Sequence, residues 1–285
     1  MLCTMDKKTI LLTLKNIKNV GNVTARRIMD SLPTVEVDLD CLWRILQCFP
    51  KIKIDGFQVV ENAYTESKKL LGRLDGSDVG MITYLDSEYP KSFLDISDFP
   101  VVLFYSGNID LLSKKCVAIV GARKASSLGR KVSYDLAKKL CKDNIIVSGL
   151  AEGIDTEAHK SAINNDGKTI AILGHGLDVV YPPQNKELSR QIVEKGGLVI
   201  SEYPFGQRHS KYTFVARNRL QSAISDEVYI VEAEEKSGTM HTAKKAKEYG
   251  KNLLVFKPKD SEKILPSGNR KLITEGATTF NEDCF

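Results

Sequence analysis

The 285-residue sequence lacks the patterns that mark a membrane protein, a secreted protein or a zinc protein. No apolar run approaches the length that crosses a bilayer. Near the N-terminus, the apolar patch Ile10-Leu11-Leu12 is too short for the core of a signal peptide. The six cysteines form no CxxC pair, which favours reduced thiols in the cytoplasm over disulfides or a zinc site. We therefore expect no membrane partner and no metal.

The signatures of several enzyme classes are also missing. There is no GxxxxGK[ST] phosphate loop, and no GxGxxG follows an expected strand, which argues against nucleotide hydrolysis of that type and against dinucleotide redox chemistry. No Ser-His-acid or paired-carboxylate arrangement can be assembled. Asp155 and His159 are four residues apart on an expected helix and can pair, but such a pair is more typical of local capping than of catalysis or metal binding. The sequence thus predicts no catalytic residue and no cofactor.

What the chain does contain is typical of a globular protein with an ordinary core. Apolar residues make up 42% and charged residues 27% of the sequence, and the formal net charge is +5. This mild positive charge permits nucleic-acid binding without requiring it. The question is therefore whether the basic residues converge in space.

Residues 1–75 are expected to form a small all-α domain. Leu14 to Leu32 has the pattern of helix, tight turn and helix, and Ile17 to Ile28 resembles a helix-hairpin-helix, a motif whose turn presents backbone N–H groups to a nucleic-acid phosphate. Asn19 stands in place of the first hairpin glycine and tolerates the left-handed conformation better than most residues. The alternative is a helical hairpin that only packs or binds a protein partner.

Residues 76–285 are expected to form an α/β domain. From Cys116 on, strand and helix patterns alternate, which predicts a parallel sheet covered by helices, with edge strands near 81–84 and 99–105. The strands are expected near 116–121, 144–149, 169–174, 198–202, 227–233 and 252–257. The helices between them are expected near 127–142, 154–165, 185–195, 215–225 and 238–249.

Small residues recur where these strands end. The first strand runs into Gly121-Ala122-Arg123-Lys124, and a helix capped by Ser126 or Ser127 follows. Such a turn presents free N–H groups and the positive end of a helix dipole, which together attract anions. A plain βα turn with solvated basic residues is the alternative for this turn alone. Further small residues at the same edge favour close approach of a phosphate, and they are Gly149, Gly174, Ser237, Gly238 and Thr239.

At this point the residues resemble those of the DNA processing protein A family (DprA, also called Smf) from about Met81 to Phe280. The resemblance rests on many short motifs in one order. They include Tyr89-Pro90, Val120-Gly-Ala-Arg123, Ser148 to His159, Gly167 to Asp178, Tyr181 to Asn185, Ser201 to Pro204, Arg217-Asn218-Arg219, Ser237-Gly-Thr239 and Gly268 to Ala277.

The resemblance implies an extended Rossmann-like domain, preceded by a helical domain of hairpin-helix or sterile-alpha (SAM-like) type. It further implies a cytoplasmic homodimer, not an enzyme, that binds and protects single-stranded DNA and loads the RecA recombinase in recombination and natural transformation. The DNA-binding residues implied by the motifs and the strand ends are Gly121, Ala122, Arg123, Lys124, Gly149, Lys168, Gly174, Arg217, Asn218, Arg219, Ser237, Gly238 and Thr239.

Three alternatives remain open. Arg217 and Arg219 can instead pair internally with Glu202 or Glu232. Tyr181, Tyr203 and Phe205 can stack on bases, although aromatic residues beside turns are more often packed. The whole chain can also be a sensor or a phosphoribohydrolase-like enzyme for a nucleotide derivative, or an interaction module with a vestigial pocket. Hydrolysis is disfavoured because Thr242 stands where the hydrolytic Glu of such enzymes would be, and threonine cannot act as a carboxylate base.

Overall fold

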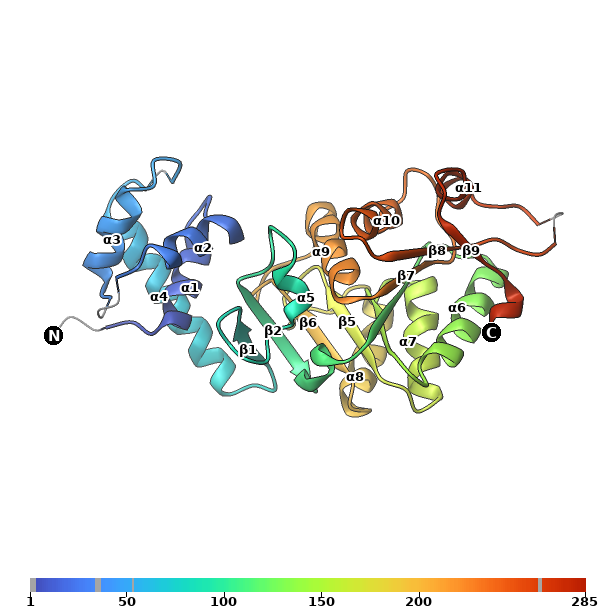
Figure 1. Ribbon diagram of the computed structural model, residues 1–285. Coiled ribbons are helices and arrows are strands. Elements are labelled where there is room, and N and C mark those ends of the chain that lie inside the picture. Colours follow the sequence, from blue (N-terminus) through green and yellow to red (C-terminus); the bar gives the residue numbers. More distant parts are fainter. Residues whose placement is uncertain (1–3, 34–36, 53, 261–262) are drawn as a thin grey trace. The chain divides into compact units, whose positions relative to one another are not determined.

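The computed structural model describes residues 4–33, 37–52, 54–260 and 263–285, which divide into two compact units. The first unit comprises residues 1–87 and 97–103, and the second comprises residues 88–96 and 104–285 (Figure 1). The units therefore divide later than the predicted boundary at residue 76.

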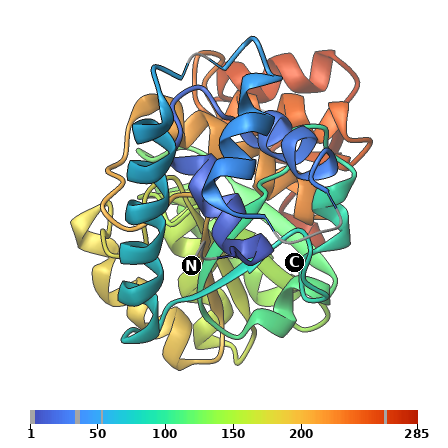
Figure 2. The same ribbon diagram turned by 90° about the vertical axis from the view of Figure 1, so that its left-hand side faces the viewer.

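The first unit begins with four helices: α1 (Lys7–Asn16), α2 (Asn22–Asp30), α3 (Leu39–Gln47) and α4 (Phe57–Asp75). Aspartates cap α1 and α3, because Asp6 accepts a hydrogen bond from Thr9 N and Asp38 accepts one from Cys41 N. The longest of the four is α4, visible as the long teal-blue helix in Figure 2. It is followed by β1 (Gly80–Thr83), which lies beside the start of β2 (Val102–Gly107).

The turn between α1 and α2 has the predicted hairpin geometry. Asn19 adopts the left-handed conformation with φ of 68°, which confirms its glycine-like role. One basic residue of this hairpin is used inside the unit, since Arg26 donates to Ser97 O at 3.1 Å and lies 4.4 Å from the centre of the Phe99 ring. For Arg26 the packing interpretation therefore holds, while Arg27 is exposed.

The second unit is built on the predicted α/β sheet. Across the described residues the strand order is β1-β2-β6-β5-β4-β3-β7-β8-β9. The second half of β2 pairs antiparallel with β6, and the pairs from β6 through to β9 are parallel. These strands are β3 (Cys116–Val120), β4 (Ile145–Ser148), β5 (Thr169–Leu173), β6 (Leu198–Ser201), β7 (Glu227–Ile230), β8 (Asn252–Phe256) and β9 (Thr278–Phe280).

The helices between the strands also match the sequence prediction. They are α6 (Ser127–Leu140), α7 (Ile154–Asn164), α8 (Lys186–Glu194), α9 (Lys211–Ile224) and α10 (Thr239–Glu248). The prediction began α9 four residues late, because it did not use the capping box of Ser210 and Thr213. It did not include α11 (Ser267–Thr274) or β9, the strand at the outer edge. The short helix α5 (Lys91–Leu94) precedes β2, where a turn and a short helix are expected from the sequence.

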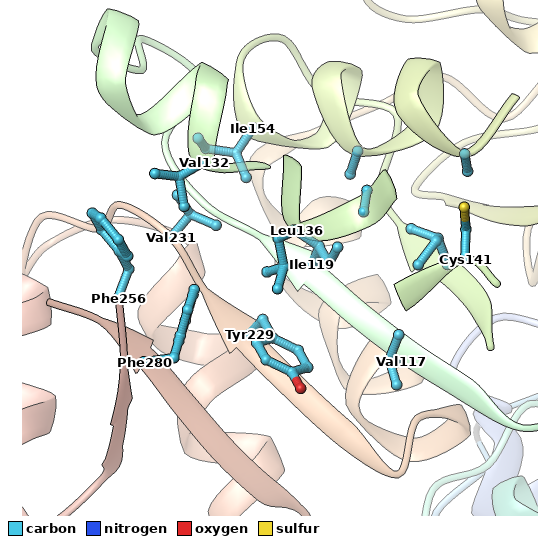
Figure 3. Packing of buried hydrophobic residues seen from close by; sticks show 14 residues of the cluster. Val117, Ile119, Val132, Leu136, Cys141, Ile154, Tyr229, Val231, Phe256 and Phe280 are labelled. Atoms are coloured by element: carbon cyan, nitrogen blue, oxygen red, sulfur yellow. The ribbon is translucent and has the colours of Figure 1, made fainter. Parts of the chain in front are cut away.

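Helices cover both faces of the sheet, with α6, α7 and α8 on one side and α9, α10 and α11 on the other (Figure 1). Under α6 and α7, a continuous apolar cluster joins helix residues such as Leu136 and Ile154 to strand residues such as Ile119, all of them buried (Figure 3). The strand β3 is buried along its whole length, as its apolar run predicts.

The strand order reverses direction at β3, because β4, β5 and β6 follow on one side and β7, β8 and β9 on the other. In open parallel sheets, ligands bind in the crevice outside the carboxyl ends of the strands at such a switch point. The fold therefore directs attention to the turns that follow β3 and β7.

Candidate nucleic-acid interface

A cavity of about 670 Å³ lies at this switch point, and we call it the switch-point cavity. Its volume falls in the range of ligand-binding pockets. The turns after β3, β4 and β7 supply part of its wall, and α9 and the start of α10 supply the rest. Residues that line it include Gly121, Ala122, Arg123, Asp155, Tyr181, His209, Lys211, Phe214, Arg217, Asn218, Gln221, Lys236, Ser237, Gly238, Thr239 and Thr242.

The lining is positively charged on balance. The cations are Arg123, Lys211, Arg217 and Lys236, and the carboxylates are Asp155 and Glu234. Both carboxylates are already engaged, since Asp155 accepts from Gly149 N at 3.0 Å and Glu234 accepts from Ser267 Oγ. A wall of this kind favours an anionic ligand.

Arg123 is one of three exposed cations at the cavity, together with Lys211 and Lys236. It belongs to the turn after β3, and its guanidinium lies 5.0 Å from the centre of the Phe214 ring on α9. Its positive charge also contributes to lowering the pKa of Arg217, so both arginines add positive charge to the same cavity. The predicted convergence of these residues is observed, and Arg123 keeps donors for a phosphate because guanidinium has five N–H groups.

Arg217 is a buried cation with an internal role. It is 4% exposed, its Nη1 donates to Ile172 O and its Nε donates to Asn218 Oδ1 at 3.2 Å. Burial lowers the pKa of Arg217 to about 10, and the charge of Asp155 opposes this. Burial likewise raises the pKa of Asp155, while Arg217 and the N–H groups of Ala151 and Gly149 lower it. Arg217 thus supplies positive charge to the cavity from a fixed position.

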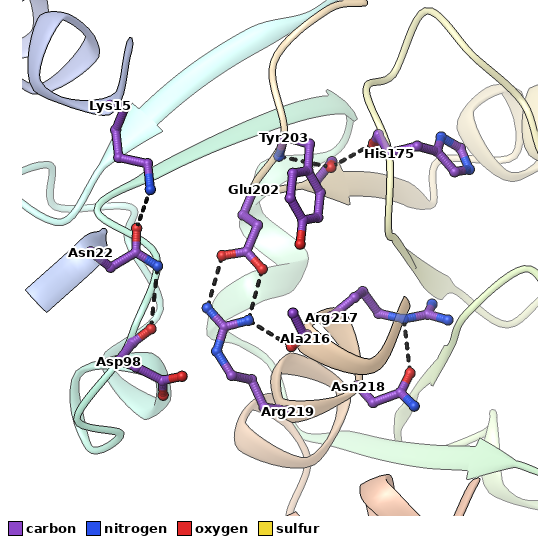
Figure 4. A network of polar contacts seen from close by, with 11 residues as sticks. Lys15, Asn22, Asp98, His175, Glu202, Tyr203, Ala216, Arg217, Asn218 and Arg219 are labelled. Carbon is purple, nitrogen blue, oxygen red and sulfur yellow. Dashed lines mark hydrogen bonds and ion pairs between the residues drawn. The ribbon is translucent and has the colours of Figure 1, made fainter. Parts of the chain in front are cut away.

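Arg219 does not reach the cavity, which corrects its prediction as a DNA-binding residue. Its guanidinium forms a bidentate ion pair with Glu202, with Nη1–Oε1 at 2.7 Å and Nη2–Oε2 at 2.8 Å, and both side chains are buried. Figure 4 shows Arg217 and Arg219 pointing in different directions from the same helix. The alternative of internal pairing with Glu202 therefore holds for Arg219.

Two of the predicted glycines make room for protein side chains instead of a phosphate. A Cβ atom added at Gly149 would lie 2.1 Å from Nη1 of Arg217, and one added at Gly174 would lie 2.8 Å from the Phe214 ring. Gly174 is therefore covered by Phe214, and its prediction as a DNA contact is wrong. Gly149 leaves the space that the Arg217 guanidinium occupies.

Lys168 lies at the opposite edge of the sheet from Arg123, which corrects the prediction that both line one rim. It precedes β5, so the five residues of that strand, about 3.3 Å each, separate it from the carboxyl edge. Its Nζ donates to Lys195 O at 2.6 Å. Lys124 follows Arg123 but is not among the cavity-lining residues, and it stays an exposed side chain beside the site.

The N-terminus of α6 already has an internal anion. The Glu232 carboxylate accepts from Ser126 N at 2.9 Å and from Ser126 Oγ, while Ser126 Oγ accepts from Gly129 N. The free helix end predicted after Gly121 is thus occupied by a carboxylate that follows β7. Glu232 is held by Ser126 at this helix end, and Glu202, the other carboxylate considered for internal pairing, binds Arg219.

The loop before α10 faces the cavity as predicted. Ser237, Gly238 and Thr239 line it, and Asn218 Nδ2 donates to Gly238 O at 3.1 Å, which holds the loop against α9. No side chain caps the N-terminus of α10. At this helix end Met240 N and His241 N donate to Ser237 O and Gly238 O at 3.2 and 3.1 Å, so the N–H groups left for a ligand are those of Gly238 and Thr239.

Aromatic rings form another part of the wall. Tyr181 stacks on His209 with ring centres 3.8 Å apart, and Phe214 lies 5.7 Å from each of these rings. Tyr181 is half-buried, as are Tyr203 and Phe205, but only Tyr181 of these three lines the cavity. His209 and Phe214 were not predicted, because no local pattern distinguishes them before the chain is folded.

The residues that suggested catalysis are arranged for structure. His159 does not pair with Asp155; its Nδ1 lies 2.7 Å from Thr169 Oγ1, and burial lowers its pKa to about 3. Among the described residues there is no group of three or more His, Cys, Asp or Glu side chains suited to a metal ion. Of the described helices, none is long and apolar enough to cross a membrane.

Comparison with known proteins gives consistent matches. The model of the family "DNA recombination-mediator protein A" matches residues 80–284. The DNA processing protein DprA of Streptococcus pneumoniae is 43% identical over 193 residues, which are 68% of this chain and 68% of that protein. The DprA of Bacillus subtilis is 34% identical over 230 residues, which are 79% of this chain and 77% of that protein.

Two solved structures are similar across most of their length. The X-ray structure of DprA from Streptococcus pneumoniae has a TM-score of 0.82 and 33% identity, and the match covers 98% of this chain and 95% of that one. A structure of DprA from Helicobacter pylori, described for its single-stranded DNA binding mode, has a TM-score of 0.64 and 32% identity over 72% of this chain and 91% of that one.

Proposed function

Since this chain belongs to the DNA recombination-mediator protein A family, we propose that it binds single-stranded DNA in the switch-point cavity. The observation that carries the proposal is the position of Arg123, an exposed guanidinium at the switch point, beside a buried second cation, Arg217. The description of the Helicobacter pylori relative as a single-stranded DNA binder supports the same ligand.

The charged and the aromatic parts of the cavity wall suit the phosphates and the bases of a single strand, respectively. Backbone phosphates meet Arg123, with Lys211 and Lys236 as further cations. Bases meet the Tyr181–His209 stack, and only unpaired bases offer their faces to such rings. Binding through phosphates and stacking depends strongly on salt and weakly on sequence.

The test is fluorescence anisotropy with a labelled single-stranded oligonucleotide from about 50 to 200 mM salt. Arg123→Ala is expected to weaken binding by about 10- to 100-fold, because a charge-assisted hydrogen bond is lost. Lys168→Ala is the matched control, since Lys168 lies at the far edge of the sheet, and it is expected to bind within about twofold of wild type. Wild-type affinity in a folded Arg123→Ala protein would overturn the assignment.

We also propose that the chain is a homodimer that delivers the bound strand to the RecA recombinase. Support comes from the family's description as a DNA recombination mediator. Sedimentation of the purified protein tests the dimer, and co-precipitation with RecA in the presence of single-stranded DNA tests the contact. A monomer that captures no RecA would refute this part and leave DNA binding untouched.

The second candidate is a sensor or enzyme for a nucleotide derivative, because the loop Lys236 to Thr242 at the start of α10 faces a cavity of ligand size. Against hydrolysis, Thr242 offers no carboxylate, and Asp155 is bound by two backbone N–H groups. We therefore propose a binding protein and not an enzyme.

A further inference from the structure

Gln221 on α9 has a side chain that the fold does not explain. It is 2% exposed and lines the switch-point cavity. Its Nε2 is buried and has no hydrogen-bond partner among the described residues. A buried amide nitrogen without an acceptor is unusual, because folded proteins satisfy nearly all such groups. The side chain is therefore placed to serve something that enters the cavity.

Ser237, across the cavity wall on the loop before α10, repeats this feature. Its Oγ is buried and also lacks a partner. The adjoining N-terminus of α10, a helix of ten residues, has no side-chain cap. Space beside this helix end is open, since a Cβ atom added at Gly238 would meet nothing closer than Asn218 Nδ2 at 4.0 Å.

The chemistry of this wall indicates an anion with several oxygen acceptors. Gln221 Nε2 and the N–H groups of Gly238 and Thr239 at the start of α10 are donors, whereas those of Met240 and His241 are already used within the turn. The helix end also carries a partial positive charge. Lys236 and His241 also line the cavity. Of the carboxylates in the lining, Asp155 is held by backbone N–H groups and Glu234 by Ser267, so neither is free to occupy the helix end.

We propose that Gln221, Ser237 and the N-terminus of α10 form a subsite for a phosphate monoester, an inference that rests on single-stranded DNA binding in the same cavity. Burial decides between a monoester and a phosphate inside a strand. Gln221 is 2% and Thr242 is 1% exposed, whereas Lys236 and Gly238 are exposed, so the wall runs from the surface inward to Gln221. A strand can end at this position with a terminal phosphate, whereas a strand bound through an internal phosphodiester would have to enter the subsite and turn out of it again. The source is the end of a strand or a free nucleoside monophosphate.

The test compares oligothymidylates of one length that carry a 5′-phosphate, a 3′-phosphate or only hydroxyl ends, with thymidine monophosphate as a competitor. One phosphorylated strand is expected to bind at least about fivefold more tightly than the hydroxyl strand, since several donors gain acceptors. The phosphorylated strand that binds more tightly shows whether the subsite receives the 5′ or the 3′ end of the DNA. Displacement of the hydroxyl strand by thymidine monophosphate at comparable concentration identifies a free nucleotide as the source.

Two variants locate the subsite. Gln221→Leu removes the donor at similar volume, and Gly238→Ala fills the open space in a backbone conformation that alanine accepts, with φ of −59°. Each is expected to reduce the preference, taken as the ratio of the affinities for the phosphorylated and the hydroxyl strand in the same variant, by about two- to tenfold. Gln191→Leu on α8, outside the cavity, is the matched control and keeps the preference.

Equal binding of all three strands, with no competition by thymidine monophosphate, would overturn the subsite while the proposed function stands. Failure of the protein to bind any strand would instead overturn the proposed function. A preference that survives in both folded variants would also refute the assignment, because the phosphate would then lie elsewhere.

Discussion

The buried pair of Arg217 and Asp155 gives the sharpest prediction about stability. Arg217→Met keeps a long apolar side chain but removes the cation, which leaves Ile172 O without its donor and the buried Asp155 carboxylate with its backbone hydrogen bonds alone. Breaking a buried charge pair by removing one partner costs about 3–5 kcal/mol. The variant is therefore expected to fold with a much lower free energy of unfolding, since domains have only about 5–15 kcal/mol.

A second substitution separates the charge from the packing. Asp155→Asn removes the negative charge and keeps an oxygen that can accept from Gly149 N. In the double variant neither charge remains, so its loss of stability is expected to be about 1–3 kcal/mol smaller than the sum of the single losses. Chemical denaturation followed by circular dichroism measures all four proteins.

The pH dependence has a definite sign. In Arg217→Met the cation that lowers the pKa of Asp155 is gone, so its folded pKa rises further above the ordinary 3.8. At pH values between 3.8 and the raised pKa, the folded variant binds a proton that its unfolded state does not. The loss of stability relative to wild type therefore shrinks as pH falls toward 3.8. Additive single losses, or a deficit independent of pH, would refute the electrostatic explanation.

Three further predictions concern the second unit. Burial lowers the pKa of His159 in the folded protein to about 3, so between that value and the ordinary 6.5 only the unfolded chain binds the proton. Between pH 7 and 5 the free energy of unfolding of wild type, measured in urea, should therefore fall by about 2 kcal/mol more than that of His159→Gln. Equal falls in the two proteins would contradict this. Gly129→Ala should lower the free energy of unfolding by about 0.5–2 kcal/mol, although alanine has the better helix propensity, because the added Cβ would displace the Glu232 carboxylate from the N-terminus of α6. A higher melting temperature of the variant would refute this prediction. Burial raises the pKa of Cys116 to about 12, so a thiol reagent should label it only on unfolding, as peptide mapping can check; rapid labelling of the folded protein would contradict this.

Periodicity and turn chemistry predicted most of the α/β elements because both signals are local. The buried run Cys116–Val120 and the glycine after it identify β3 without reference to any other strand. The same kind of signal was too weak for α11 and β9. The division of the chain into units could not be predicted, since it depends on tertiary contacts such as the hydrogen bond from Arg26 to Ser97 O.

For the candidate site, the sequence identified Arg123 and the loop 237–239 because both follow strands, and strand ends share an edge of a parallel sheet. Lys168 was assigned by resemblance although it precedes its strand, and that position alone places it at the other edge. Arg219 could not be told from Arg217 by sequence: two positions apart on a helix, they point in different directions, and only the packed neighbours show which one meets Glu202.

The sequence by itself determined the order of strands and helices, the parallel sheet and the edge at which a ligand binds, because these follow from hydrophobic period and chain direction. Only the tertiary structure decided which polar groups remain available there. Glu232 fills one helix end and Phe214 covers one glycine, while Gln221 is left without a partner. Hydrogen-bond satisfaction depends on residues far apart in sequence, so it cannot be read from any single segment.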